Sequence, residues 1–269
     1  MLPRFTGSKS LNDMIAFSAI FYHDQNLSRY ADKLEVRKFI TQTIGDKYLS
    51  QILQVADGVD DLNLEEAVGH FVKTNHDSGG FFKFEKMSQE KSLKTKMNNH
   101  LSHKDYGVHK GEYMYRGIAP KVFVECLHTP PTGQSELKVW RIFFHFGSPL
   151  FIQVNQDSFS PDLTDVYNPD FVPICRYYSH NQGDAQIASE KPPSITSHAT
   201  ETTIKEILAI GQKCTAHFHF CRFDILNTQK GICFSEITFM PVSGCFNEAL
   251  ANELGCLALL HAPNFFKKA

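Results

Sequence analysis

Several short apolar segments around and beyond the middle of the chain most constrain how it can fold. They are rich in Val, Ile and Phe, and turn residues flank them, which is typical of strands. They lie at residues 121–126, 137–146, 150–155, 217–226 and 231–239. Helical periodicity dominates both ends, at residues 10–42, 202–213 and 247–260, and Ser10 is placed to cap the first helix. Strands in the centre with helices at both ends predict an α+β fold.

The first half of the chain contains a strand, a glycine loop and a second strand. The apolar runs at 69–73 and 81–84 predict the strands, and the polar segment 75–80 between them carries two glycines. A charged surface helix is expected at 91–101, and a short helix at 46–55. These expectations place short strands on both sides of the middle of the chain.

Composition excludes several classes of protein. The 269 residues include 42% hydrophobic and 21% charged side chains, an ordinary balance for a soluble globular protein, and the net charge of −2 gives no basic excess for nucleic acid. No run approaches about 18 apolar residues, so we expect a cytoplasmic protein without an integral membrane segment. The seven cysteines have no CxxC spacing, which predicts buried thiols and no zinc site.

Arg222, Asp224 and Glu236 form the most informative group. Two antiparallel strands joined by a short turn would bring Asp224 and Glu236 together on one face, if the pairing register allows it. Paired carboxylates are costly unless a cation lies between them, and Mg²⁺ takes carboxylate and phosphate oxygens. Arg222 has the same strand parity as Asp224 and suits a phosphate. The alternative is a surface ion pair beside a solvated glutamate.

The glycine loop offers a second group of candidates. Lys73 leaves a buried strand just before Ser78, Gly79 and Gly80, and free backbone N–H groups beside a lysine suit a phosphate chain. His76 lies within the loop and can contact a phosphate. An ordinary hairpin turn with a structural histidine is the alternative.

Three charged residues at strand positions complete the candidates. Glu125 ends an apolar strand and can accept hydrogen bonds from the ribose or amino group of a nucleotide. Lys138 and Arg141 lie on a strand that is otherwise apolar, so each needs a partner. A phosphate group or an internal carboxylate would provide one, and we take both residues as catalytic candidates.

Five blocks of sequence follow one another along the chain: 32–37 (DKLEVR), 71–79 (FVKTNHDSG), 111–115 (GEYMY) with Glu125, 137–139 (LKV), and 222–224 (RFD) with 236–239 (EITF). In this order, they resemble the ATP-grasp superfamily and, within it, the TupA-like branch associated with teichuronopeptide and other bacterial surface polysaccharides. The resemblance covers nearly the whole chain. Thr238 replaces the usual Asn, as in the TupA-like branch, and Val242 replaces Gly in the closing turn. Lys73 stands one place early, which turns it to the other strand face unless a bulge absorbs the shift.

The resemblance implies an ATP-grasp fold, in which two α+β lobes hold ATP between them after an N-terminal helical segment. The expected divisions are residues 1–60 for that segment, 61–127 for the smaller lobe with the glycine loop, and 128–269 for the larger lobe. The cofactors implied are ATP and Mg²⁺. The implied ATP contacts are Lys73, His76, Ser78, Gly79, Gly80, Glu125 and Lys138, the implied metal ligands are Asp224, Glu236 and Thr238, and Arg222 would stabilise an acyl-phosphate.

The function expected from this resemblance is an ATP-dependent carboxylate–amine ligase. It would amidate a uronic acid or a similar carboxylate of a sugar or glycan precursor, with an amine as the second substrate. A glycosyltransferase or kinase of polysaccharide assembly is the alternative, and comparing the binding of ATP with that of UDP-sugars separates them. A non-catalytic binding protein is a further alternative, which ATP turnover would exclude.

Residues 158–200 have little apolar periodicity and are rich in proline, so a long loop is expected there. We expect it to be a mobile lid in which Arg176 and Tyr178 contact a sugar or carboxylate substrate. A surface insertion without a role is the alternative.

Overall fold

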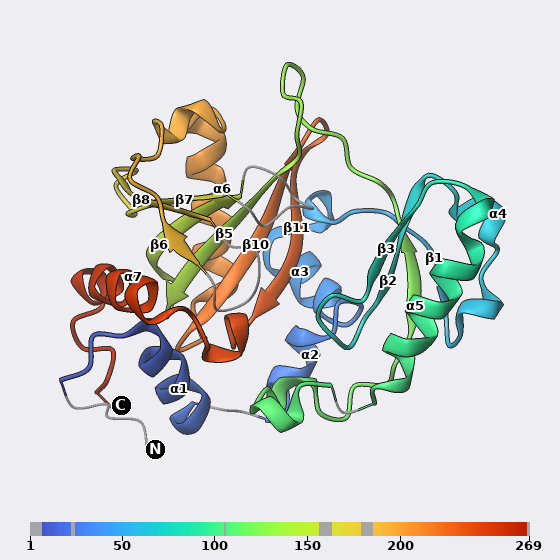
Figure 1. Ribbon diagram of the computed structural model, residues 1–269, viewed down its shortest axis with the longest axis horizontal. Helices are drawn as coiled ribbons and strands as arrows, with labels where there is room; N and C mark the ends of the chain where they lie inside the picture. The colour runs from blue at the N-terminus through green and yellow to red at the C-terminus, as the bar shows by residue number, and fades with distance from the viewer. Residues whose placement is uncertain (1–6, 23–24, 105, 156–162, 179–184, 268–269) are drawn as a thin grey trace. The chain divides into compact units, whose positions relative to one another are not determined.

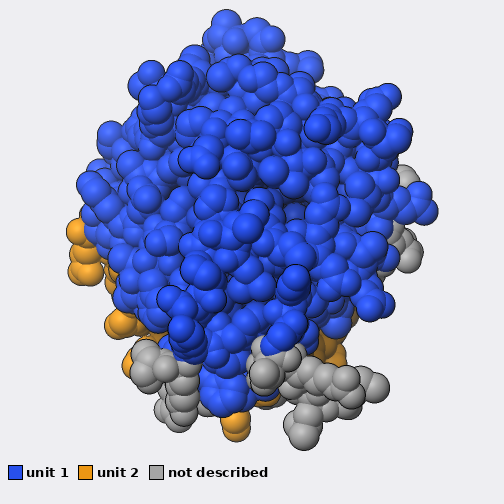
Figure 2. Space-filling model, turned by 90° about the vertical axis from the view of Figure 1, so that its left-hand side faces the viewer, with its two compact units in different colours: residues 1–23, 43–48, 129–269 blue, residues 24–42, 49–128 orange. Residues whose placement is uncertain are grey.

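The computed structural model describes residues 7–22, 25–104, 106–155, 163–178 and 185–267 (Figure 1). The chain forms two compact units, which Figure 2 colours separately. One consists of residues 1–23, 43–48 and 129–269, and the other of residues 24–42 and 49–128. The chain therefore divides after residue 128, and residues 1–60 are shared between both units.

The larger unit is built on a seven-stranded antiparallel sheet. Its strand order is β11-β10-β5-β6-β7-β8-β9. The strands are β5 (Lys138–His145), β6 (Ser148–Asn155), β7 (Leu163–Tyr167), β8 (Pro173–Tyr178), β9 (Gln186–Ile187), β10 (Cys221–Thr228) and β11 (Gly231–Thr238). Its helical elements are α1 (Leu11–Phe21), η2 (Asp46–Tyr48), η7 (Ile195–Ser197), α6 (Glu201–Thr215), η8 (Pro241–Gly244) and α7 (Glu248–His261).

Helices cover both faces of this sheet. On one face, α6 packs against β5 and β10, and Gly211 leaves room for the ring of Phe144, which a side chain there would strike. On the other face, α7 packs against β6 and also contacts α1 (Figure 1). At Gly255, the backbone of α7 comes so close to the start of α1 that a Cβ atom would not fit. The sheet is therefore the middle layer of this unit.

The smaller unit is built on a four-stranded antiparallel sheet of order β1-β4-β2-β3. The strands are β1 (Ile52–Ala56), β2 (His70–Thr74), β3 (Phe81–Phe84) and β4 (Val122–Glu125). Its helical elements are η1 (Gln25–Leu27), α2 (Ser28–Ala31), α3 (Val36–Ile44), η3 (Val59–Asp61), α4 (Leu64–Ala67), η4 (Met87–Gln89), α5 (Glu90–Ser102), η5 (Val108–Lys110) and η6 (Tyr113–Tyr115). One face carries the core, where Leu93 and Met97 of α5 pack on Val72 and Val124.

Most predicted elements are present, and the α+β prediction is confirmed. Ser10 caps α1, its hydroxyl accepting a hydrogen bond from the backbone N–H of Asn12. Of the seven free cysteines, four are buried, and Cys245 and Cys256 are exposed. Within the described part of the chain, no helix is both long and apolar enough to cross a bilayer.

Two predicted elements are wrong. The short helix expected at 46–55 is only a 3₁₀ turn at Asp46–Tyr48, and Ile52–Ala56 forms the edge strand β1. The long loop expected at 158–200 contains strands β7, β8 and β9, since its polar side chains pair inside the sheet, as described below. The parts of the expected lid at 158–162 and 179–184 lie outside the described residues.

Candidate active site

The β10–β11 hairpin brings the two predicted metal carboxylates together. Asp224 and Glu236 are directly paired across the two strands, and Arg222 pairs with Thr238 two positions away. Directly opposite residues of an antiparallel pair project from the same face. The four side chains therefore share one face of the sheet.

A β-bulge at Ser235 produces this arrangement. From the turn up to Ile225 and Phe234 the ladder is regular, and the next pair is Asp224 with Glu236, so that Ser235 is the extra residue. A ladder without the bulge would pair Asp224 with Ser235 and turn Glu236 to the opposite face. With Ser235 present in the sequence, the pairing of Asp224 with Glu236 therefore requires the register shift at this position.

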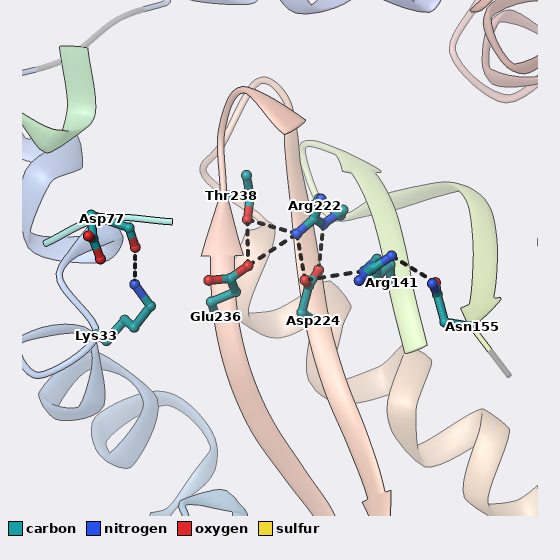
Figure 3. Close-up of polar contacts among 8 residues, drawn as sticks. All are labelled: Lys33, Asp77, Arg141, Asn155, Arg222, Asp224, Glu236 and Thr238. Atoms are coloured by element: carbon teal, nitrogen blue, oxygen red, sulfur yellow. Dashed lines mark hydrogen bonds and ion pairs between the residues drawn. The ribbon is translucent and has the colours of Figure 1, made fainter. Parts of the chain in front are cut away.

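Arg222 links the two carboxylates (Figure 3). Its Nε and Nη2 donate to the two oxygens of Asp224, each at 2.7 Å, and Nη2 also donates to Glu236 Oε1 at 3.1 Å. Thr238 accepts from the same Nη2 at 3.2 Å and donates its hydroxyl proton to Glu236 at 3.3 Å. A cation thus already lies between the carboxylates, which is the position where the sequence predicted a metal ion.

Arg141 extends the site along the sheet. It is the cross-strand partner of Asp224 on β5, and its Nε lies 3.8 Å from Asp224 Oδ2, too far for a hydrogen bond. Its Nη1 donates to Asn155 Oδ1 at 2.8 Å (Figure 3). Two arginines and two acids therefore balance in formal charge.

The electrostatics of the site follow from its burial. Burial raises the pKa of Asp224. The negative charge of Glu236 adds to this effect, while Arg222 opposes both. Burial lowers the pKa of Arg141, and Arg222 lowers it further. Each charge is therefore held in place by its neighbours, and removing one leaves another uncompensated.

The ligand atoms suit magnesium. Asp224, Glu236 and Thr238 offer only oxygens, and Mg²⁺ typically takes one or two carboxylates and completes its shell with water and phosphate oxygens. No three His, Cys, Asp or Glu side chains converge anywhere in the described chain. The donor set fits an ion that arrives with a phosphate-bearing ligand better than one held by protein alone.

Lys138 lies on the other face of the sheet. It pairs with Asn227 of β10. Both residues are three positions from the pair of Asp224 and Arg141, so their side chains project from the opposite face. Its Nζ contacts His198 Nδ1 at 3.0 Å, and burial lowers its pKa, opposed by Glu136 and Asp165. The structure therefore separates Lys138 from the Arg222 group, although sequence analysis had placed them together.

Arg176 belongs to the same buried network as Lys138. Its Nε and Nη2 donate to the two oxygens of Asp165 at 2.5 and 3.1 Å, and Asp165 is fully buried. His198 Nε2 lies 3.2 Å from Asp165 and 2.8 Å from the hydroxyl of Tyr167. Tyr178, the other substrate candidate, is 42% exposed on β8.

In the smaller unit, Lys73 and Glu125 form an ion pair across β2 and β4. Phe71 is the direct partner of Glu125, and Lys73 lies two positions further along β2. Lys73 therefore projects from the same face as Glu125, and the core residue Val72 projects from the opposite face. No irregularity interrupts the pairing of β2 with β3 or with β4. Burial raises the pKa of Glu125, and Lys73 and Ser50 outweigh this effect and hold it below its usual value.

The glycine loop is organised around a buried aspartate. Thr74 donates its hydroxyl proton to Asp77, and His100 and the ammonium group of Lys33 contact the same residue (Figure 3 draws Lys33 with Asp77). A Cβ atom at position 80 would collide with Thr74 and Asp77, so Gly80 is required there. Ser78 and Gly79 are exposed.

His76 is fully buried within this loop, and its ring lies beside the backbone of His100 and His103. Burial lowers its pKa, so it is neutral at pH 7.

Sequence reasoning missed the residues that support these candidates. Ser50, Asp77 and His100 lie in segments that gave only a turn or a helix signal, and Asn155 and Asp165 read as ordinary loop or strand-end residues. Side-chain contacts between segments that are distant in sequence identify them, and a single sequence does not show such contacts.

The sequence model of the family described as TupA-like ATPgrasp matches residues 15–258. Because that match covers most of the chain, this protein belongs to the TupA-like ATP-grasp family. No curated protein matches the sequence.

Several solved structures of ligases are similar to the chain. D-alanyl-alanine synthetase A from Vibrio cholerae O1 biovar eltor str. N16961 has 14% identity and a TM-score of 0.47, over 89% of this chain and 66% of that one. D-alanine–D-alanine ligase from Bacillus anthracis has 12% identity and a TM-score of 0.43, over 88% and 69%. ATP-grasp ligase PsnB, complexed with minimal precursor, has 12% identity and a TM-score of 0.42, over 88% and 62%. This chain thus spans about two thirds of the length of these proteins.

Proposed function

We propose that this protein is an ATP-dependent ligase that joins a carboxylate to an amine through an acyl-phosphate. The observation that carries this proposal is the pairing of Asp224 with Glu236 on adjacent strands, with the guanidinium of Arg222 between them. Membership of the TupA-like ATP-grasp family gives this geometry its chemical context.

Asp224, Glu236 and the hydroxyl of Thr238 would hold Mg²⁺. When bound, Mg²⁺ would neutralise charge that gathers on the phosphoryl group during transfer. With Arg222 and Arg141, the site is already balanced, so a divalent ion alone adds two positive charges that nothing in the site offsets. A triphosphate supplies the missing negative charge, and we expect metal and nucleotide to bind together.

The reaction that this site would support has two steps. A carboxylate oxygen of the acid substrate attacks the γ-phosphorus of ATP, the bond to the β-phosphate oxygen breaks, and ADP leaves. The amine nitrogen then attacks the acyl carbon, inorganic phosphate leaves, and the nitrogen loses a proton. Arg222 would stabilise the negative oxygens in both steps, because its guanidinium offers several donors in a fixed plane.

The smaller unit would supply contacts to the nucleotide. The ammonium group of Lys73 and the backbone N–H groups at Ser78, Gly79 and Gly80 suit phosphate oxygens. The buried imidazole of His76 would supply a further contact to phosphate oxygens. Glu125 would accept hydrogen bonds from the nucleoside, and we keep Lys138 as a candidate for a second phosphate contact.

The acid substrate proposed is a uronic acid or a similar carboxylate of a surface-polysaccharide precursor. This part of the proposal rests on the resemblance to the TupA-like branch. Arg176 and Tyr178 remain substrate candidates, although the guanidinium of Arg176 is already paired with Asp165. A cytoplasmic location would supply the ATP.

Transfer of an oxygen atom tests the proposal directly. The protein is incubated with Mg²⁺, ATP, an amine panel and uronic acids labelled with ¹⁸O in the carboxylate. One ¹⁸O atom in the released phosphate and an amide product of matching mass are expected, because the acyl-phosphate carries that oxygen to phosphorus. ADP release with unlabelled phosphate would contradict the mechanism, and binding of UDP-sugars in place of ATP would favour a glycosyltransferase.

A further inference from the structure

Beside the carboxylate pair, two buried donors on neighbouring strands lack a hydrogen-bond partner. They are Nε of Arg141 on β5 and the side-chain nitrogen of Gln153 on β6. Neither has a hydrogen-bond partner among the described residues, and Arg141 Nε has only the 3.8 Å ion pair with Asp224 Oδ2. Gln153 is only 2% exposed. A buried donor without a hydrogen bond destabilises the folded state, and native proteins rarely leave one without a reason.

The register places these two donors side by side on the face that carries the metal candidates. Arg141 pairs directly with Asp224 on one side and with Gln153 on the other. Glu236, Asp224, Arg141 and Gln153 therefore form one row across four strands. Side chains of directly paired residues have Cβ atoms about 4.5–5.5 Å apart, so their donors can converge on one small group.

Uncharged polar side chains occupy the next row on the same face. Asn155 pairs with Thr164, and Thr164 pairs with Tyr177. The three are 1%, 1% and 6% exposed. Asn155 already accepts a hydrogen bond from Arg141, which ties the two rows together (Figure 3). Such groups suit the hydroxyl groups of a ligand better than an apolar chain.

We propose that Arg141 and Gln153 bind the carboxylate of a hydroxylated carboxylic acid, with Asn155, Thr164 and Tyr177 beside its hydroxyl groups. This inference rests on the proposed function and names the place of its acid substrate. One donor from each residue matches the two oxygens of a carboxylate, and the charge of Arg141 strengthens the contact. The bound carboxylate then lies beside Asp224, where the metal and the γ-phosphate are proposed to bind.

Replacing Gln153 by Met tests the inference through stability. The change removes an unpaired buried amide and nearly conserves volume, so the melting temperature of the free protein should rise by about 2 °C. Gln212 on α6 is exposed, so Gln212→Met serves as the matched control and should leave the melting temperature unchanged. A fall in melting temperature for Gln153→Met would show that a buried water or another group satisfies the amide, and the inference would be overturned.

Ligand binding gives the second test. D-Glucuronate should raise the melting temperature of the wild type and of Gln212→Met in the presence of Mg²⁺ and ADP, and D-glucose, which lacks the carboxylate, should not. In Gln153→Met, the glucuronate concentration needed for the same shift should rise at least tenfold. Absence of any glucuronate effect in the wild type, or an equal effect in Gln153→Met, would refute the inference.

The affinity for Mg²⁺ and ADP, measured by calorimetry in the same variants, separates this inference from the proposed function. Both variants should bind the nucleotide within about twofold of the wild type. If the wild type binds glucuronate but no nucleotide, the proposed function fails and the carboxylate site stands.

Discussion

Acid should destabilise this protein through His219. The ring of His219 stacks on Tyr22, with centroids 3.8 Å apart, and the side chain is 5% exposed. Its Nε2–H donates to the carbonyl oxygen of Phe265 at 3.2 Å, and its Nδ1 has no partner within the described part of the chain. Burial lowers the pKa of His219 to about 4, and His145 adds to this effect.

The sign and the size of the effect follow from linkage. The folded-state pKa lies below the ordinary value of 6.5, so neutral His219 contributes stability above pH 6.5, and this contribution is lost as the pH falls toward 4. A pKa difference of this size corresponds to about 3 kcal/mol at full protonation. Between pH 7 and pH 4.5 we expect a loss of about 2 kcal/mol, after allowing for partial screening by solvent.

Urea unfolding of the wild type and of His219→Gln at a series of pH values measures this loss. Glutamine keeps a donor near the position of Nε2 and does not titrate, so the variant should regain about 2 kcal/mol relative to the wild type between pH 7 and pH 4.5. The exposed His217→Gln is the matched control and should follow the wild type. If the free energy of unfolding depends on pH equally in the wild type and in His219→Gln, the reasoning is refuted.

Three further changes have definite expected outcomes. Val242 has a left-handed backbone (φ 56°), so Val242→Gly should raise the free energy of unfolding by about 0.5–1 kcal/mol. A lower free energy of unfolding, measured with urea, would contradict the strain at Val242. Asp165→Asn leaves the guanidinium of Arg176 without its buried counter-charge and should cost about 3–5 kcal/mol, whereas a loss below 1 kcal/mol would contradict the pairing. Deleting Ser235 removes the bulge and leaves Asp224 and Glu236 opposite each other, so Mg²⁺-dependent ADP binding should persist in calorimetry. Loss of this binding in a folded variant would contradict the register.

Much of the fold was predictable because local patterns and tertiary pairing agree. The apolar runs became strands, and the hairpin between Arg222 and Thr238 formed as its turn and alternation predicted. Strand parity also carried information about Lys138 and Arg141. Three positions apart on one strand, they must project from opposite faces, and the structure places them so.

Other features depend on partners that are distant in sequence. Ile52–Ala56 is an edge strand with apolar residues on both faces, so its pattern resembles a helix turn. In β7 and β8, Asp165 is buried and Arg176 half-buried because they pair with each other, which removes the alternation that marks a strand. The bulge at Ser235 has no signal in its own residues, and it still decides which face Glu236 occupies.

Calorimetric titration of ADP with and without Mg²⁺ tests the central claim that Asp224 and Glu236 hold a nucleotide-bound metal ion. In the wild type and in the exposed control Asp170→Asn, Mg²⁺ should raise the affinity for ADP at least tenfold, a gain of about 1.4 kcal/mol. In Asp224→Asn and Glu236→Gln this gain should disappear, while Mg²⁺-free binding stays within about twofold. An undiminished effect of Mg²⁺ in both folded variants would contradict the account.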